Sequence, residues 1–288
     1  MTDQPIFETG GFGWIPSSWD KKYKHNELFS ASWYFPIVAT SVEVIHLLPP
    51  EFKTWYNQGQ RNACVGASTA QLMAFINLKQ IGKRQYDWLR HYCLACEIDH
   101  DPVTTCQRDI GTTAWAGLDV IRNKGAYVVG SGWKLDEGIA EYRWINPNKC
   151  IDETRTALAQ GQLVATASPW FEGFNPERLV NKNGEWWFPP RSKWGRALGG
   201  HMYGRYAASD IRQATGMSNT WGDNYYDLVW MDNRDYEFLH TVGAESAALI
   251  DRDFVPPPPP VEPPTAQEYI DLTGVAGGKN FAGRAVKA

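Results

Sequence analysis

A run of prolines near the C-terminus limits what this chain can fold into more than any other stretch. Residues 255–265 read V-P-P-P-P-P-V-E-P-P-T, and proline lacks the backbone N–H that helices and sheet ladders require. Such a run adopts the extended polyproline II conformation and acts as a stiff spacer. We therefore expect a globular body over residues 1–254, a linker over residues 255–265 and a tail over residues 266–288. The tail is either a docking segment or a disordered end.

Composition places the body among ordinary globular proteins. The chain has 288 residues, 43% of them hydrophobic, which excludes a disordered or fibrous protein. The net charge is −4 and the Lys and Arg residues are scattered, so no nucleic-acid partner is expected. No signal-peptide pattern or membrane-span pattern is present, so we expect a cytoplasmic protein without membrane contact. The 5 cysteines leave at least one thiol free in a monomer, which fits a reducing compartment.

Helical and extended patterns occupy different parts of the chain. After residue 63, apolar residues recur at three- and four-residue steps, the spacing of a buried helix. Further helical patterns cover residues 88–96, 113–124 and 151–160, and extended runs cover residues 163–167, 185–188, 202–207 and 228–231. This segregation predicts an α+β fold with an irregular arm over residues 1–44, a helical lobe over about 45–135 and a β-rich lobe over about 136–254. An active-site cleft is expected where the lobes meet.

Cys64 lies where a polar loop turns into the first apolar helix. A thiol attacks a carbonyl well only as the thiolate, which a helix N-terminus and a neighbouring imidazolium stabilise. By contrast, Cys93 and Cys96 fall within a helical pattern. Cys106 follows that pattern, and Cys150 lies in a predicted turn. Cys64 is therefore the predicted nucleophile.

A base and an orienting group are predicted from the second half of the chain. His201 follows two glycines and opens an extended run, and Asn219 begins the later sequence N-T-W-G. An imidazole can take the thiol proton, and an amide can hold that imidazole in one tautomer. Trp221, next to the amide, can shield their hydrogen bond from water. Each signal is weak alone, and their combination and order indicate a catalytic site.

In these residues the chain resembles the papain-like cysteine peptidases, particularly their bacterial and phage members. Gln58 precedes Cys64 at the family's glutamine-to-cysteine spacing, and Ala63 matches the small residue before the nucleophile. Residues 219–222, N-T-W-G, are similar to the family's N-S-W-G signature. The sequence G-W-I-P at residues 13–16 looks like the lead-in of bacterial members. The resemblance covers roughly residues 13–245 and leaves the linker and tail outside it.

The resemblance implies a papain-like two-lobed fold and cysteine endopeptidase activity on a peptide or protein substrate, without metal or cofactor. Cys64 would attack the scissile carbonyl while His201 accepts and later donates the proton. Asn219 would fix the ring tautomer. The Gln58 side chain and the Cys64 backbone N–H would form the oxyanion hole.

The resemblance also implies a substrate-binding set beside the catalytic residues. Gly111 and Thr112 would hydrogen-bond the substrate backbone, and Trp221 would wall the site. Arg61 stands where other members have a disulfide cysteine. The first 44 residues show no inhibitory helical pro-segment pattern, so zymogen control is not expected.

A second cluster offers an alternative to this site. His91, Cys93, Cys96, His100 and Cys106 are residue types that bind zinc. Only one C-x-x-C is present and a second pair is absent, so buried thiols are the preferred interpretation and no metal is expected.

Three functions remain open at this stage. The first is a protein-cleaving endopeptidase in phage or bacterial protein maturation. The second is a hydrolase of cell-wall peptide stems, which the 14 tryptophans and the proline-linked tail mildly favour. The third is a non-catalytic structural protein, such as a virion component docked through the tail to a phage particle. A purely structural protein has no need of the quartet Gln58, Cys64, His201 and Asn219, so the catalytic interpretations are preferred.

Overall fold

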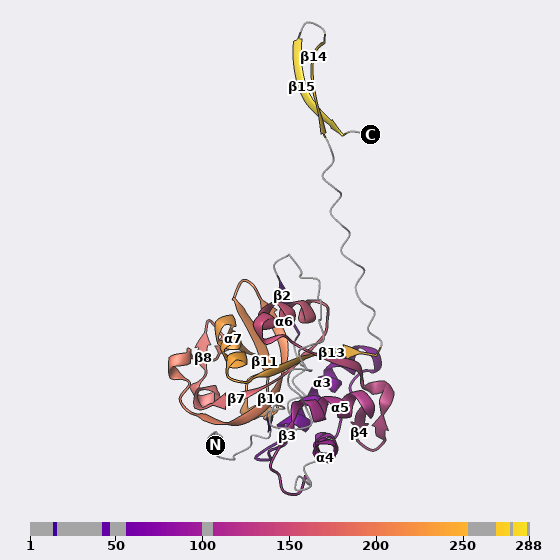
Figure 1. The fold of residues 1–288 in the computed structure, drawn as a ribbon, viewed down its shortest axis with the longest axis vertical. Coiled ribbons are helices and arrows are strands. Elements are labelled where there is room, and N and C mark those ends of the chain that lie inside the picture. The colour runs from indigo at the N-terminus through magenta and orange to yellow at the C-terminus, as the bar shows by residue number, and fades with distance from the viewer. Residues whose placement is uncertain are drawn as a thin grey trace. The chain divides into compact units, whose positions relative to one another are not determined.

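The computed structural model describes residues 14–15, 42–46, 56–99, 106–252, 269–276 and 279–286. The chain divides into two units, Met1–Phe254 and Val255–Ala288, each of which is described by itself. Most of the predicted arm and the whole proline linker lie outside the described residues. The second unit contains an antiparallel hairpin formed by β14 (Tyr269–Ala276) and β15 (Lys279–Val286) (Figure 1). The sequence pattern of the tail does not predict this hairpin.

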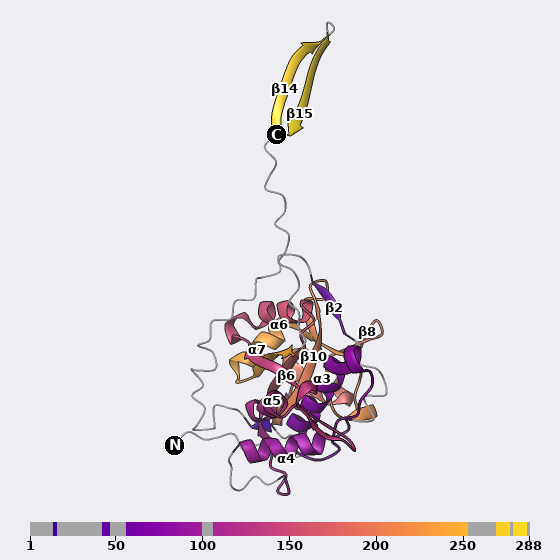
Figure 2. The ribbon, with the colours of Figure 1, turned by 90° about the vertical axis from the view of Figure 1, so that its right-hand side faces the viewer.

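The helices of the first unit form two groups. They are α3 (Cys64–Ile81), α4 (Trp88–Ile98), α5 (Ala114–Asn123), α6 (Cys150–Ala159) and α7 (Asn233–Thr241). Both Figure 1 and Figure 2 show α4 and α5 close together near α3, while α6 and α7 neighbour each other elsewhere in the unit. The four helices predicted from the sequence are confirmed, whereas α7 was not predicted. Among the described residues, no helix combines the length and the apolar character needed to cross a bilayer.

One large sheet forms the other half of the unit. Its described strands run in the order β6-β13-β7-β10-β11-β12-β9-β8, with β2 paired to β10. They are β2 (Glu43–Ile45), β6 (Ile139–Trp144), β7 (Val164–Phe171), β8 (Val180–Lys182), β9 (Glu185–Trp187), β10 (Ala197–Ser209), β11 (Ala214–Ser218), β12 (Val229–Asp232) and β13 (Glu245–Asp251). All neighbours are antiparallel except β12 and β9. Helices and strands are segregated, so the predicted α+β class is confirmed.

Two short pairs lie outside this sheet. β4 (Ala126–Val128) and β5 (Gly132–Lys134) form an antiparallel hairpin. β1 (Trp14–Ile15) pairs in parallel with β3 (Thr112–Thr113). The second pair joins the predicted N-terminal arm to the predicted substrate-binding residues, and the sequence gives no periodic signal for a two-residue strand.

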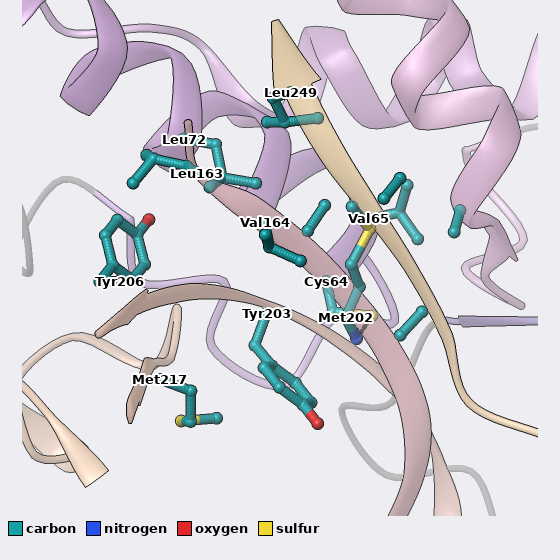
Figure 3. Packing of buried hydrophobic residues seen from close by; sticks show 14 of the residues in the cluster. Cys64, Val65, Leu72, Leu163, Val164, Met202, Tyr203, Tyr206, Met217 and Leu249 are labelled. Atoms are coloured by element: carbon teal, nitrogen blue, oxygen red, sulfur yellow. Dashed lines mark hydrogen bonds between the residues drawn. The ribbon is translucent and has the colours of Figure 1, made fainter. Parts of the chain in front are cut away.

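The core lies between α3 and the sheet. Figure 3 shows Val65 and Leu72 with Val164 and Met202 in one apolar cluster. Nearly every residue in the first three turns of α3 is buried, including the polar Ser68, Thr69 and Gln71, because α4, α5 and β10 all pack against this helix. Complete burial of a side chain such as Leu72 contributes about 1.5–3 kcal/mol.

A glycine allows α4 to lie close against α3. A Cβ atom at Gly66 would be 2.5 Å from the Trp88 carbonyl oxygen and 2.5 Å from the Tyr92 nitrogen. A side chain there would force the two helices apart, because backbone atoms cannot yield as a flexible side chain can. The glycine two residues after Cys64 therefore fixes how α4 supports the start of α3.

The cysteines differ from the sequence interpretation in two respects. Cys93 and Cys106 form a disulfide, so their interpretation as buried thiols is wrong, since pairing cannot be deduced from spacing alone. Cys150 opens α6 and is buried, whereas a turn was predicted. Cys64 and Cys96 are also buried and belong to no disulfide among the described residues. The disulfide removes the cysteine-based argument for a reducing compartment.

The zinc alternative gains no support. His91 accepts a hydrogen bond at Nε2 from the Tyr127 backbone N–H (2.9 Å), and its Nδ1 is 3.2 Å from the Thr69 hydroxyl. Cys93 is bound to Cys106, and His100 lies outside the described residues. The Cys96 sulfur lies 4.0 Å from the Gly111 carbonyl oxygen. Among the described residues, no three His, Cys, Asp or Glu side chains are placed to hold a metal ion together.

Candidate active site

Cys64 is the first residue of α3, as the sequence predicts. Ala63 precedes it with a non-helical backbone and no capping side chain, and the first turn contains no acidic residue. The thiol therefore lies at the positive end of the helix dipole without a competing carboxylate in that turn. Its Sγ accepts a hydrogen bond from the Met202 backbone N–H at 3.3 Å. This bond brings the thiol to the residue next to His201.

His201 lies on β10 and pairs with Asn219, which directly follows β11. The antiparallel pairing of β10 with β11 places Ser218 opposite Gly204. Asn219, the residue after Ser218, therefore lies toward the His201 end of β10. His201 Nε2 is 2.7 Å from Asn219 Oδ1. The same Oδ1 also accepts the Thr220 backbone N–H at 2.7 Å, which marks it as the oxygen. Since an amide oxygen only accepts, Nε2 carries the proton and Nδ1 is the basic nitrogen of the neutral ring.

Aromatic rings enclose the imidazole. The ring centroids of Trp170 and Trp221 lie 4.7 and 4.9 Å from that of His201, and His201 is completely buried. Burial lowers the pKa of His201 to about 4, while the Asn219 hydrogen bond opposes this shift. The imidazole is therefore neutral at pH 7.

Gln58 is held on the other side of the site by the residue after Asn219. The Thr220 hydroxyl donates to Gln58 Oε1 at 2.7 Å, and the Gln58 N–H donates to the Thr220 carbonyl at 3.0 Å. Gln58 Nε2 donates to the Arg61 carbonyl at 2.9 Å. A primary amide has two N–H donors, and this bond uses one of them. Hydrogen bonds thus hold both the oxygen and the nitrogen of the Gln58 side-chain amide.

The segment that carries Trp221 is pinned to the loop before Cys64. Trp221 forms an isolated backbone bridge with Asn57. Gly222 has φ +58, and a Cβ atom there would lie 2.9 Å from Asn57 Nδ2. Glycine adopts this positive φ without strain, and any larger residue would push the Asn57 side chain aside. The N-T-W-G sequence therefore holds the segment after Asn219 against the loop that precedes Cys64.

Gly111 and Thr112 lie in the same region but differ in what they offer a substrate. The Gly111 N–H donates to the Tyr92 hydroxyl at 3.1 Å, so this donor serves the protein itself. The Thr112 hydroxyl donates to Asp99 at 2.6 Å. The Thr112 backbone pairs with Trp14, which demonstrates that this strand can bind an extended partner.

Trp14 also covers the residue before His201. A Cβ atom at Gly200 would lie 2.6 Å from ring carbon Cε3 of Trp14, and Trp14 is itself buried. Cys64 and His201 both have 0% exposure. In this conformation β1 is paired with Thr112 and lies against Gly200, and neither Cys64 nor His201 is open to solvent.

The structure brings the predicted residues together and adds supports that were not predicted. Thr220 orients Gln58, Trp170 packs on the imidazole, and Asp99 fixes β3. Of these, only Thr220 had a usable signal, its place inside the N-T-W-G sequence. The other two come from distant parts of the chain and depend on tertiary packing.

Comparison with known proteins adds to this geometry. No protein-family model and no curated protein matches the chain. Among solved structures, xylellain, a cysteine protease from Xylella fastidiosa, matches with a TM-score of 0.63 and 18% identity over 86% of this chain and 99% of xylellain. The chain has the papain-like cysteine peptidase fold. Procathepsin B S9 from Trypanosoma congolense also matches, with a TM-score of 0.50 and 12% identity over 84% of this chain and 86% of that chain.

In this papain-like fold the site lies between the helices and the sheet. Cys64 comes from the helical side, and His201 and Asn219 come from the sheet side. The predicted papain-like α+β architecture is confirmed. Which reaction this chain performs follows from its own residues.

Proposed function

We propose that the protein is a cysteine peptidase that hydrolyses peptide bonds through an acyl-enzyme at Cys64. One observation carries the proposal. The His201–Asn219 hydrogen bond uses Nε2 and so leaves Nδ1 as the base, while the adjacent Met202 N–H binds the sulfur at the start of α3. A structural protein has no need to bury an imidazole and a thiol in this arrangement.

Each step of the reaction balances with these groups. Cys64 gives its proton to His201 Nδ1 and its sulfur bonds to the scissile carbonyl carbon. When the C–N bond breaks, Nδ1 returns the proton to the leaving amine and a thioester remains. A water molecule then gives a proton to Nδ1 while its oxygen attacks the thioester, which releases the acid and restores the thiol. The Asn219 contact stabilises the imidazolium that forms twice in this cycle.

Gln58 and the backbone N–H of Cys64 are the proposed oxyanion donors. The contacts to Thr220 and Arg61 hold the Gln58 amide rigidly, and preorganised donors cost no reorganisation during the reaction. Loss of one such donor costs about 100-fold or more in kcat. Thr112 is the proposed partner for the substrate backbone, because its strand already binds β1 in that manner.

The substrate and the setting stay predictions from the sequence. An endopeptidase and a cell-wall peptide hydrolase use the same chemistry and differ only in substrate. A phage or bacterial origin, a cytoplasmic or virion location and docking through residues 266–288 also stay predictions. We rank the non-catalytic alternative below both hydrolases because of the His201 arrangement.

Labelling with an epoxysuccinyl peptide, followed by mass mapping, tests the proposal. We expect selective modification of Cys64 that is lost in His201→Ala. Cys96 and Cys150 serve as internal controls, because burial raises the pKa of each to about 12 and keeps them as unreactive thiols.

Because β1 lies beside the site, the same labelling is also carried out on a variant that lacks the Trp14 ring. Trp14→Ala opens the cleft, so its Cys64 should react at least as fast as that of the native chain. Failure of Cys64 to react selectively in both proteins, with their folding verified by circular dichroism, would refute the peptidase proposal.

A further inference from the structure

A second concave site lies on the sheet side of the first unit. This pocket has a volume of about 390 Å³, within the range of small-ligand sites. It lies where β2, β9 and β12 come together with the segment before β12. The residues that carry the argument are Ile45, Glu185, Trp186, Tyr226, Asp227 and Trp230. None of them takes part in the proposed peptidase chemistry.

Aromatic rings form the wall of the pocket. Trp186 and Tyr226 stack with ring centroids 3.8 Å apart and an interplanar angle of 18°. Both rings are half-buried, and Trp230, which also lines the pocket, is buried. The stack holds the indole in one orientation, so a ligand does not have to order it. A rigid aromatic surface of this kind binds flat apolar faces at low entropic cost.

Two carboxylates accompany the rings. Glu185 is fixed by Arg212, with Nη2 to Oε1 at 2.8 Å, and this contact lowers the pKa of Glu185. Asp227 is exposed. Ionised carboxylates are pure acceptors, so they suit a ligand that donates through hydroxyl groups. Their charge disfavours an anionic ligand.

Arg212 also argues against a cationic ligand. Its guanidinium carbon lies 4.8 Å from the centroid of the Trp230 ring. The protein's own cation therefore already occupies that cation–π position, and it would repel a second one. The remaining ligand class is neutral, with apolar C–H faces for the rings and hydroxyl donors for the carboxylates.

We propose that this pocket binds a neutral saccharide, with one sugar ring stacked on Trp186 and its hydroxyls donating to Glu185 and Asp227. A pyranose ring combines an apolar C–H face with a rim of hydroxyl donors, which are the two properties that the pocket complements. This binding site does not depend on the peptidase activity.

The pocket is close to the catalytic site along the chain. Trp221, whose ring centroid is 4.9 Å from that of His201, precedes Tyr226 by five residues, a span of at most about 18 Å. This separation is short enough for a ligand that carries both a saccharide and a peptide branch to extend from the pocket to the cleft. This last step rests on the proposed peptidase function, and the substrate class it indicates is a peptide-substituted glycan.

The test is calorimetric titration of the full chain with a panel of neutral trisaccharides: chitotriose, cellotriose and maltotriose. We expect at least one to bind, and Trp186→Ala to weaken that binding about tenfold, the effect of losing one stacking contact. Ile45→Trp should weaken it similarly by filling the pocket without removing the platform. The matched control is Ile211→Ala, an exposed apolar residue outside the pocket, which should leave the affinity unchanged.

The outcomes separate cleanly. Absence of binding by all three sugars overturns the saccharide site, as does binding that both pocket variants retain. Melting curves show whether Trp186→Ala has unfolded, and Ile45→Trp decides the matter in that event. Cys64→Ala should bind the sugar as the native chain does, so a failed peptidase proposal and a failed saccharide site give different results.

Discussion

Three buried histidines make the stability of the first unit depend steeply on pH. His91 and His201 are completely buried and His240 nearly so. Burial lowers the pKa of His91 to about 3, of His201 to about 4 and of His240 to about 3. In the unfolded chain each would titrate near 6.5. Below that pH the unfolded chain therefore binds protons that the folded chain excludes.

The sign and the size follow from this difference. The stability that depends on neutral histidines is fully present above pH 6.5 and is lost as the pH falls toward the folded-state pKa values. One buried histidine loses about 2 kcal/mol between pH 7 and pH 5, because each pH unit well below 6.5 costs about 1.4 kcal/mol. Three lose about 6 kcal/mol, a large part of the 5–15 kcal/mol typical of a domain.

His91→Gln removes the contribution of one of the three histidines to the pH dependence of stability. Glutamine keeps an acceptor for the Tyr127 N–H but does not titrate in this range. Urea unfolding, followed by tryptophan fluorescence at pH 7, 6 and 5, gives the free energy of unfolding of both proteins. Glu153 and Asp235 have raised pKa values from burial and act in the opposite direction, but they are common to both proteins and cancel. We expect the variant to lose about 2 kcal/mol less across this range, and parallel curves would refute the reasoning.

Three further predictions concern the site and its supports. Asn219→Ala should lower kcat/KM about 10- to 100-fold without abolishing turnover, because one hydrogen bond to a charged ring is lost; an unchanged rate on a fluorogenic peptide would remove Asn219 from the site. Trp14→Ala should raise the rate of Cys64 labelling about 5- to 30-fold, the effect of 1–2 kcal/mol of lost packing, and an unchanged rate in the folded variant would show that β1 does not limit access. Cys93→Ser should lower the free energy of unfolding by roughly 3 kcal/mol at neutral pH, measured in urea, and equal stability would mean that the Cys106 disulfide does not form.

Local patterns were sufficient for the parts of the fold that depend on continuous sequence. The start of α3 at Cys64 was predictable because apolar residues begin there and continue over several turns. By contrast, α7 has only nine residues, and its buried face consists of Tyr236, Leu239 and His240, too few positions to establish a helical period from sequence alone. Its start is fixed by Asp232, whose side chain accepts the Arg234 N–H at 2.9 Å, a capping contact that a single aspartate in the sequence does not by itself predict.

The candidate site was predictable in its residue types but not in its supports. Cys64, His201 and Asn219 each stand beside a distinctive local feature: a helix start, a glycine pair and the N-T-W-G sequence. The position of Trp14 over Gly200 has no local signature, because a two-residue strand forms only when its partner is in place. Glu153 on α6 has no local signature of burial either, yet it is buried and accepts the Asn146 N–H at 2.8 Å.

The Met202 side chain has no part in the proposed chemistry, but the backbone N–H and carbonyl of Met202 both form hydrogen bonds with α3. Its N–H donates to the Cys64 sulfur at 3.3 Å, and its carbonyl accepts the Ser68 hydroxyl at 2.7 Å. Cys64 and Ser68 are one helical turn apart. Sliding β10 along α3 would break both bonds. The two contacts therefore hold β10 in register with α3, which keeps His201, the residue before Met202, next to the Cys64 sulfur.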